Sequence, residues 1–258
     1  MDRERFLQVC EKVVNYKRES TGIGTLGEKT LHAVVKHYIE LDENKQEVKV
    51  GSFYADIVTE AGIYEIHTRS FNTLRKKLTE FLEISPVTVV YPLPGNKWLL
   101  WIDGKTGEVT KKRKSPKQGC IYDAIHELYK IRPLIKHPNF RLHIVFIDIE
   151  EYRNLDGWSE NKKKGSSRYD RIPVDITGEA YFGEIKDYLQ FIPVELDTQF
   201  TSKDYKKAAK INMRTAQTAL NILHHIGTLR RVGKKGNLHV YERTDPAMAN
   251  SSTLLASG

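Results

Sequence analysis

The chain has 258 residues, enough to bury one large hydrophobic core or two smaller ones. Its 41 Lys and Arg against 33 Asp and Glu give a formal net charge of +8, a modest excess that fits a polyanionic partner. The two cysteines, Cys10 and Cys120, lie far apart in sequence and give neither a disulfide framework nor zinc-ligand spacing, as expected in a reducing cytoplasm. The N-terminus is charged from its second residue, and no apolar run approaches the roughly 20 residues that span a bilayer, so we expect neither a signal peptide nor a membrane partner.

The first ninety residues predict two helices, three short strands, a third helix and a fourth strand. Apolar residues recur at helical spacing in the helices, and short β-type runs bounded by turn residues mark the strands. The segments are, in order, helices 3–17 and 27–41, strands near 46–50, 52–59 and 63–68, helix 72–83 and strand 86–91. Three meandering strands followed by a crossover helix imply the α/β class, with a mixed central sheet flanked by helices.

The middle of the chain predicts further sheet elements and then an exposed basic segment. The predicted elements are strands 97–103 and 108–113 around a turn, helix 121–131 and strand 141–149. Residues 157–171 are charged and rich in Gly and Ser, which is typical of an exposed loop. We therefore expect an α/β domain over 1–155 and a basic linker or loop over 156–175.

The last third predicts a helix over 179–190, two short helices and a basic hairpin. The later elements are helices 203–209 and 213–225 and strands 229–232 and 238–242. Ser202 is the expected N-cap of the first short helix, and Gly227 is the expected C-cap glycine of the second. This order resembles a small winged helix-turn-helix domain over 176–245, followed by a disordered tail over 246–258.

The stretch 56–68 predicts a tight β-hairpin that turns around Ala61 and Gly62. Because side chains alternate along strands, Asp56 shares a face with Glu65 and His67 of the next strand. The expected register puts Asp56 opposite His67 and makes Asp56 and Glu65 diagonal neighbours, roughly 7–8 Å apart at the backbone. Two converging carboxylates can bind one hard cation, Mg²⁺ or Mn²⁺. The alternative is a pair of ordinary surface acids, although β-propensity disfavours acids within apolar strands.

Asp56 at the end of one strand, Glu65-x-His67 on the next and Glu28 on the preceding helix resemble the PD-(D/E)xK motif of the restriction-endonuclease-like superfamily. The order helix, three strands, helix, strand over 27–91 is similar to the core of that superfamily. The resemblance implies that Asp56 and Glu65 bind the metal, and that the backbone carbonyl of Ile66 completes the set. It implies that Glu28 binds the metal directly or through water, and that all four motif residues are catalytic.

His67 stands where the superfamily has lysine, which positions or activates the attacking water. Histidine can serve as a base when neutral or as a cation when protonated. Glu28 also fits a helix acid favoured by the dipole of the first turn. It shares a helix face with His32 and Lys36, and we expect His32 to lie on the flank of the helix surface.

Basic residues in the second half of the chain predict a DNA-binding surface. Residues at the start of the recognition helix would meet base edges, and residues of the wing would meet phosphates. The candidates are Arg214, Thr215 and Gln217 on the helix, Arg230, Arg231, Lys234 and Lys235 on the wing, and Arg69 just after the hairpin. Protein–protein contact is the alternative role for such a module.

The leading hypothesis is a Mg²⁺- or Mn²⁺-dependent DNA endonuclease, and the alternative is a catalytically inactive, nuclease-fold DNA-binding regulator. A homodimer would supply the two active sites that double-strand cutting usually needs. No P-loop and no nucleophile elbow occurs in the sequence. A G-x-G-x-x-G run over 22–27 does not follow a clear strand, so a dinucleotide site is not expected.

Overall fold

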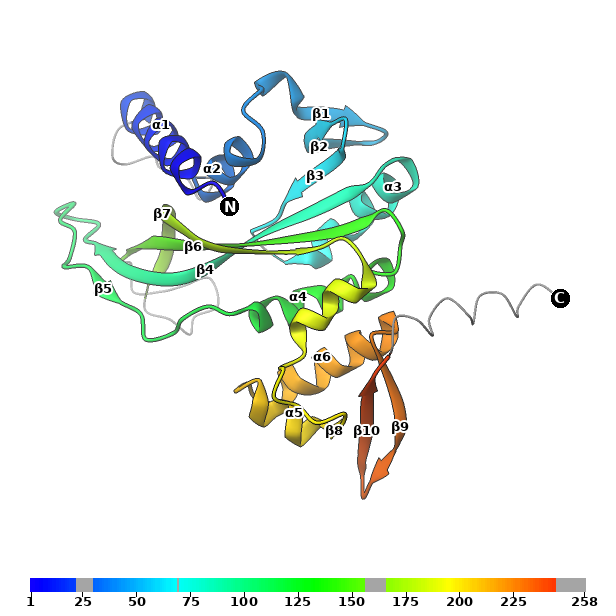
Figure 1. Cartoon of the computed structure of the whole chain (residues 1–258). Helices are drawn as coiled ribbons and strands as arrows, with labels where there is room; N and C mark the ends of the chain where they lie inside the picture. Colours follow the sequence, from blue (N-terminus) through cyan, green and yellow to red (C-terminus); the bar gives the residue numbers. More distant parts are fainter. Residues whose placement is uncertain (22–29, 69, 156–165, 245–258) are drawn as a thin grey trace. The chain divides into compact units, whose positions relative to one another are not determined.

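The computed structural model describes residues 1–21, 30–68, 70–155 and 166–244 (Figure 1). The chain forms two compact units, each built from three separate segments. Unit 1 consists of Met1–Arg69, Thr88–Cys120 and His143–Ala180, and unit 2 consists of Ser70–Val87, Ile121–Leu142 and Tyr181–Gly258. The two units therefore interleave along the sequence, whereas the sequence had predicted two contiguous domains joined by a linker.

Unit 1 holds most of the strands and the two N-terminal helices. Its elements are α1 (Arg3–Thr21), α2 (Thr30–Ile39), the 3-10 helix η1 (Glu43–Lys45), β1 (Gln46–Val50), β2 (Phe53–Thr59), β3 (Gly62–Ile66), β4 (Val87–Ile102), β5 (Arg113–Lys114), β6 (Phe140–Asn154) and β7 (Ser167–Phe182). Strands β4, β6 and β7 continue for a few residues into the segments of unit 2.

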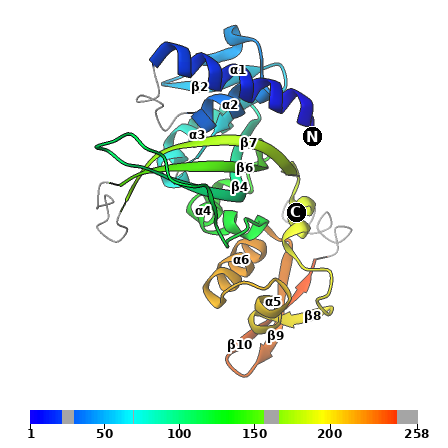
Figure 2. The ribbon, with the colours of Figure 1, turned by 90° about the vertical axis from the view of Figure 1, so that its left-hand side faces the viewer.

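Among the described residues, seven strands form one mixed sheet in the order β1-β2-β3-β4-β6-β7, with β5 beside β4. The first three strands are an antiparallel meander. Helices α1 and α2 cover one face of the sheet (Figure 2). The core between helices and sheet is apolar and includes Phe6, Val9, Leu31, Val34, Val35, Ile57, Val90, Val145, Ile147 and Ile176. The predicted α/β class with a mixed, helix-flanked sheet is confirmed.

Strand β7 occupies residues for which the sequence predicted a linker and the start of a helix. Both predictions were wrong over 167–182, because the charges that suggested an exposed loop have partners across the fold. Asp170 is fully buried and accepts a hydrogen bond from the Thr30 hydroxyl at 2.5 Å. The Arg168 guanidinium lies 3.7 Å from the carboxylate of Glu151 on β6. The remainder of the predicted loop, 156–165, lies outside the described residues.

Unit 2 contains short helices and a second, smaller sheet. Its elements are η2 (Phe71–Leu74), α3 (Arg75–Ile84), η3 (Ile121–Ala124), α4 (Ile125–Lys130), η4 (Arg132–Leu134), η5 (Ile185–Phe191), β8 (Gln199–Thr201), α5 (Ser202–Ala208), α6 (Met213–Ile226), β9 (Leu229–Lys235) and β10 (Leu238–Arg243). In the described part of this unit, the sheet order is β8-β10-β9, and all pairings are antiparallel.

The ends of α5 and α6 follow from local capping. Thr201, and not Ser202 as predicted, is the N-cap of α5: its hydroxyl accepts from the Lys203 N–H at 3.3 Å, and Asp204 accepts from the Thr201 N–H at 2.8 Å. Gly227 ends α6 with a φ of 91°, so its predicted C-cap role is confirmed. The expected disordered tail begins beyond the described residues.

The predicted helix over 179–190 was wrong in its type and in its start. The chain remains in strand β7 up to Phe182, and the 3-10 helix η5 then runs over Ile185–Phe191. The rings of Phe182 and Phe191 stack with centroids 5.1 Å apart, which anchors this turn in the core of unit 2. Over the part of the chain that is described, no helix is both long and apolar enough to cross a membrane.

Candidate functional site: an acidic fork between two strands

The hairpin of β2 and β3 forms as predicted, but in a different register. Val58 pairs with Ile63 and Thr59 pairs with Gly62, so the loop is formed by Glu60 and Ala61. Gly62, the first residue of β3, has a φ of 127°, a backbone conformation that favours glycine. Continuing this pairing, Asp56 lies across from Glu65 and not across from His67. The predicted register was therefore shifted by two residues.

At the two acids, side-chain hydrogen bonds continue the contact between strands β2 and β3. Their described register extends only as far as the Ile57–Tyr64 pair, and side chains make the next hydrogen bonds. The Ile66 N–H donates to Asp56 Oδ2 at 2.7 Å, and the Asp56 N–H donates to Glu65 Oε1 at 3.1 Å. Each carboxylate thus accepts a backbone hydrogen bond from the opposite strand. We call this arrangement of Asp56 and Glu65 the carboxylate fork.

The carboxylate fork is largely shielded from solvent. Glu65 is 3% exposed, and the Asp56 side chain is 14% exposed. Burying an ionised carboxylate is costly unless it is hydrogen-bonded or bound by a cation. The reciprocal hydrogen bonds offset part of that cost and fix both side chains in position.

His32 of α2 contacts the carboxylate fork through Asp56. Its Nε2 lies 3.3 Å from Asp56 Oδ2, and its side chain is 28% exposed. The expectation that His32 lies on the flank of the helix surface was wrong, because α2 packs with this edge toward the sheet. The one signal available in the sequence was its spacing of four residues from Glu28, which places both on one helix face.

The remaining motif residues are only partly described. His67 directly follows β3, and its backbone N–H donates to the Val90 carbonyl of β4 at 2.9 Å. It is half-buried and lies two residues beyond Glu65. Glu28 and Arg69 lie outside the described residues.

The donor set fits a hard divalent cation bound in an open site. Mg²⁺ in proteins typically uses one or two carboxylates and keeps several waters, and Asp56 and Glu65 provide such a pair. Among the described residues, no group of three or more His, Cys, Asp or Glu side chains forms a complete set of metal ligands.

A second charged cluster in unit 1 surrounds Glu151, which is only 2% exposed. Its carboxylate lies 2.6 Å from the Arg153 guanidinium, 3.4 Å from Lys97 Nζ and 3.7 Å from the Arg168 guanidinium. Burial by itself would raise the Glu151 pKa, but Lys97, Arg153 and Arg168 together hold that pKa below its ordinary value. Three cationic side chains therefore surround this one buried carboxylate.

In unit 2, the predicted nucleic-acid residues fall into two groups. Arg214 and Gln217 are exposed at the start of α6, and Lys234 and Lys235 are exposed on the hairpin. Thr215 is 6% exposed, and its hydroxyl lies 3.0 Å from His126 Nε2, so the prediction that Thr215 meets a base edge does not fit its position.

The two hairpin arginines, Arg230 and Arg231, are exposed, and each contacts a side chain of β10. Arg230 donates to Glu242 at 3.0 Å, and the guanidinium of Arg231 lies 5.7 Å from the ring centroid of Tyr241. These contacts join each arginine to a side chain of the facing strand β10.

The fold and the site together define an α/β protein with a carboxylate fork between strands of a mixed sheet. The chain belongs to the family described as a domain of unknown function, DUF8091, whose model matches residues 29–183. That range includes both acids of the fork and every strand of the seven-stranded sheet.

The chain is also similar to a Treponema pallidum (strain Nichols) protein described as an uncharacterized protein. The two are 27% identical over 232 residues, which cover 87% of this chain and 88% of the relative. No solved structure matches the chain.

Proposed function

We propose that this protein is a divalent-metal-dependent nuclease that hydrolyses DNA phosphodiesters. The observation that carries the proposal is the carboxylate fork, in which Asp56 and Glu65 are brought together and fixed by opposite strands. The element order α2-β1-β2-β3-α3-β4 and the strand order β1-β2-β3-β4 support a restriction-endonuclease-like arrangement around it.

Asp56 and Glu65 would hold Mg²⁺ or Mn²⁺, with Glu28 and the Ile66 carbonyl as further ligands. When bound, such an ion supplies positive charge to the phosphate and acidifies a coordinated water. The chain itself orients the site: the Ile66 N–H and His32 hold Asp56, and the Asp56 N–H holds Glu65.

Hydrolysis forms one P–O bond from water and breaks the bond to the leaving oxygen. The attacking water must lose a proton, and an imidazole is a suitable acceptor near neutral pH. His67 occupies the position of the superfamily lysine and is the proposed acceptor. His32, in contact with Asp56, is proposed to position that carboxylate.

The second part of the proposal concerns DNA binding by unit 2. The order β8-α5-α6-β9-β10, with β10 between β8 and β9, supports a winged helix-turn-helix. Arg214 and Gln217 on α6 would contact bases, and the exposed hairpin cations would contact phosphates. Thr215 is excluded from this surface by its burial.

The test is a nuclease assay on plasmid, single-stranded and branched DNA with Mg²⁺ or Mn²⁺. We expect Asp56→Asn and Glu65→Gln each to lower the cleavage rate by roughly 100-fold or more, as is usual when a group that stabilises transition-state charge is removed. Glu47→Gln is the matched control, because Glu47 lies on the neighbouring strand β1 and is paired with Lys36 at 2.6 Å. Cleavage that persists in Asp56→Asn would exclude the fork as the active site.

The alternative function is a catalytically inactive, DNA-binding regulator with a nuclease fold. The observation that favours it is His67 in place of the lysine. This reading predicts DNA binding that is independent of metal and unchanged by Asp56→Asn, with no cleavage of any substrate. Calorimetry with Mn²⁺ separates the two functions, since only the nuclease requires the metal to bind at the fork. A homodimer that pairs two such sites is proposed for the nuclease and is checked by sedimentation.

A further inference from the structure

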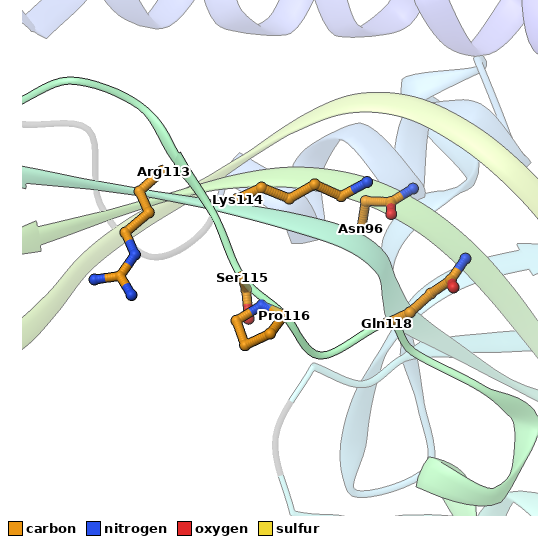
Figure 3. A pocket seen from close by; sticks show the side chains of 6 residues that line it. All are labelled: Asn96, Arg113, Lys114, Ser115, Pro116 and Gln118. Atoms are coloured by element: carbon orange, nitrogen blue, oxygen red, sulfur yellow. The ribbon is translucent and has the colours of Figure 1, made fainter.

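A pocket of about 430 Å³ opens beside β4 and β5 in unit 1 (Figure 3). Its volume is within the range of roughly 300–1,000 Å³ that is common for small-molecule sites. The lining residues are Asn96, Arg113, Lys114, Ser115, Pro116 and Gln118. Two of the six are cations and none is acidic, so the lining favours an anionic ligand.

The pocket wall is held to β4 at both ends of the segment 115–119. The Ser115 N–H donates to the Lys97 carbonyl at 2.7 Å, and the Gly119 N–H donates to the Gly95 carbonyl at 2.8 Å. A Cβ on Gly119 would lie 1.8 Å from the Pro94 carbonyl oxygen, so only glycine allows this close approach. The wall is therefore in place before any ligand arrives.

Asn96 is oriented by an acid that does not line the pocket. Its backbone N–H donates to Asp148 Oδ1 at 2.6 Å, and its Nδ2 donates to both Asp148 oxygens at 3.1 Å. With its donors used in this way, the amide presents Oδ1 as an acceptor. The ligand should therefore carry a hydrogen-bond donor as well as a negative charge.

Lys114 connects the pocket to an aromatic surface. It pairs with Trp98 across β4 and β5, and its Nζ lies 5.8 Å from the Trp98 ring centroid. In Figure 3 its side chain extends toward Asn96, while Arg113 points the other way. Lys112 Nζ is 4.7 Å from the same ring and also bonds Glu150 at 2.6 Å. A half-buried tryptophan beside two lysines is suited to base stacking together with phosphate binding.

We propose that this pocket binds one nucleotide of single-stranded nucleic acid. Lys114 and the Ser115 hydroxyl take the phosphate, and the Asn96 Oδ1 and Gln118 meet donors of the base. Trp98, which lies beside the pocket in contact with Lys114, provides the stacking surface. This assignment deepens the proposed function, on which it rests for the class of ligand, because it places single-stranded substrate on unit 1.

The experiment measures binding of a labelled single-stranded oligonucleotide by anisotropy, with the full chain in EDTA so that cleavage plays no part. We expect Lys114→Gln to weaken binding by about 10-fold, the loss of one well-placed phosphate contact. Lys111→Gln is the matched control, because Lys111 is exposed and lies in the same basic run but does not line the pocket. It should change the affinity less than about 2-fold, since a solvated charge contributes weakly.

Several outcomes would overturn the proposal. Equal losses in Lys114→Gln and Lys111→Gln would mean general charge attraction without a pocket site. Duplex DNA bound as tightly as the single strand, with the same loss in Lys114→Gln, would remove the single-strand assignment. Inorganic phosphate competing as well as a mononucleotide would reduce the pocket to an anion site.

Variants also separate this inference from the nuclease proposal. Trp98→Phe should retain the fold and weaken oligonucleotide binding. It therefore tests the pocket inference even if Lys114→Gln unfolds. If Asp56→Asn abolishes cleavage while Lys114→Gln binds normally, the pocket inference fails and the nuclease stands. If Lys114→Gln weakens oligonucleotide binding but no substrate is cut, the nuclease proposal fails and the pocket inference stands.

Discussion

Glu179 on β7 is a carboxylate whose titration the fold changes strongly. It lies 3.2 Å from His143 Nε2 and 3.0 Å from the amino group of Met1, and it accepts a hydrogen bond from the Tyr38 hydroxyl at 3.3 Å. The hydrogen bond with His143 contributes most, and together with the amino group it lowers the Glu179 pKa from 4.5 to about 2 despite burial. The ionised carboxylate is therefore favoured by the folded state.

The stability of the protein should fall with acidification in a window set by this shift. Because the folded pKa is depressed, the contribution is fully present above pH 4.5 and is lost as the pH falls toward about 2. The full shift corresponds to roughly 3 kcal/mol of unfolding free energy at most. Urea unfolding at several pH values checks this: Glu179→Gln should be less stable above pH 4.5 and should flatten the slope below it. An unchanged slope in Glu179→Gln would show that other carboxylates, such as Glu151, dominate the acid response.

The packing of helix α6 determines which of its side chains are accessible. Its buried face includes Ala216, Ala219, Leu220 and Leu223. One flank lies against α4 and η4: Thr215 meets His126 of α4, and the guanidinium of Arg132 of η4 donates to the side-chain carbonyl of Asn221. The side that carries Arg214 and Gln217 is exposed.

We expect Arg214→Gln to lower DNA affinity several-fold without loss of stability, since the side chain is exposed. Thr215→Val, one residue away, should leave DNA affinity unchanged and lower the unfolding free energy by about 1 kcal/mol, the usual cost of a lost hydrogen bond. Anisotropy and urea unfolding on the same samples measure both quantities. A loss of DNA affinity in Thr215→Val equal to that in Arg214→Gln would contradict the assigned geometry.

The elements predicted well from sequence are those with strong local signals. Helix α6 has an asparagine N-cap, Asn212, and a C-cap glycine, Gly227, which are visible in the sequence. The register of β2 and β3 depended on whether Gly62 lies inside the turn or begins β3, and the sequence Ala61-Gly62 fits both positions. Strand β7 depended on distant partners such as Thr30, which no local pattern reveals.

The same distinction applies to the candidate site. Asp56 and Glu65 are nine residues apart on one hairpin, so their approach follows from local strand geometry. The contact between His32 and Asp56 joins α2 to β2 and depends on how the helix packs on the sheet. Sequence reasoning therefore predicted that the two acids lie together, and it missed the histidine that contacts Asp56.

At the scale of the whole molecule, the interleaved segments make unit 2 dependent on residues far apart in sequence. The rings of Phe191 and Tyr205 each lie 6.3 Å from that of Tyr122, and helix α6 packs against α4. Ile125 and Leu128 of α4 are at most 1% exposed in the whole chain. Segment Ile121–Leu142 therefore packs against the part of the chain that follows Ala180.

A chain truncated after Gly183, where the family match ends, should fail to fold to a native core in unit 2. It lacks η5, α5, α6 and both hairpin strands, so the apolar side chains of α4 lose their cover. We expect it to bind a hydrophobic dye, to aggregate, and to lose hydrogen-exchange protection in α4. A chain ending at Thr244 is the control, since it retains all described elements of unit 2 and should match the full chain. A 1–183 chain as stable and monomeric as that control would contradict the interleaved division, because residues 1–183 would then form an independent domain.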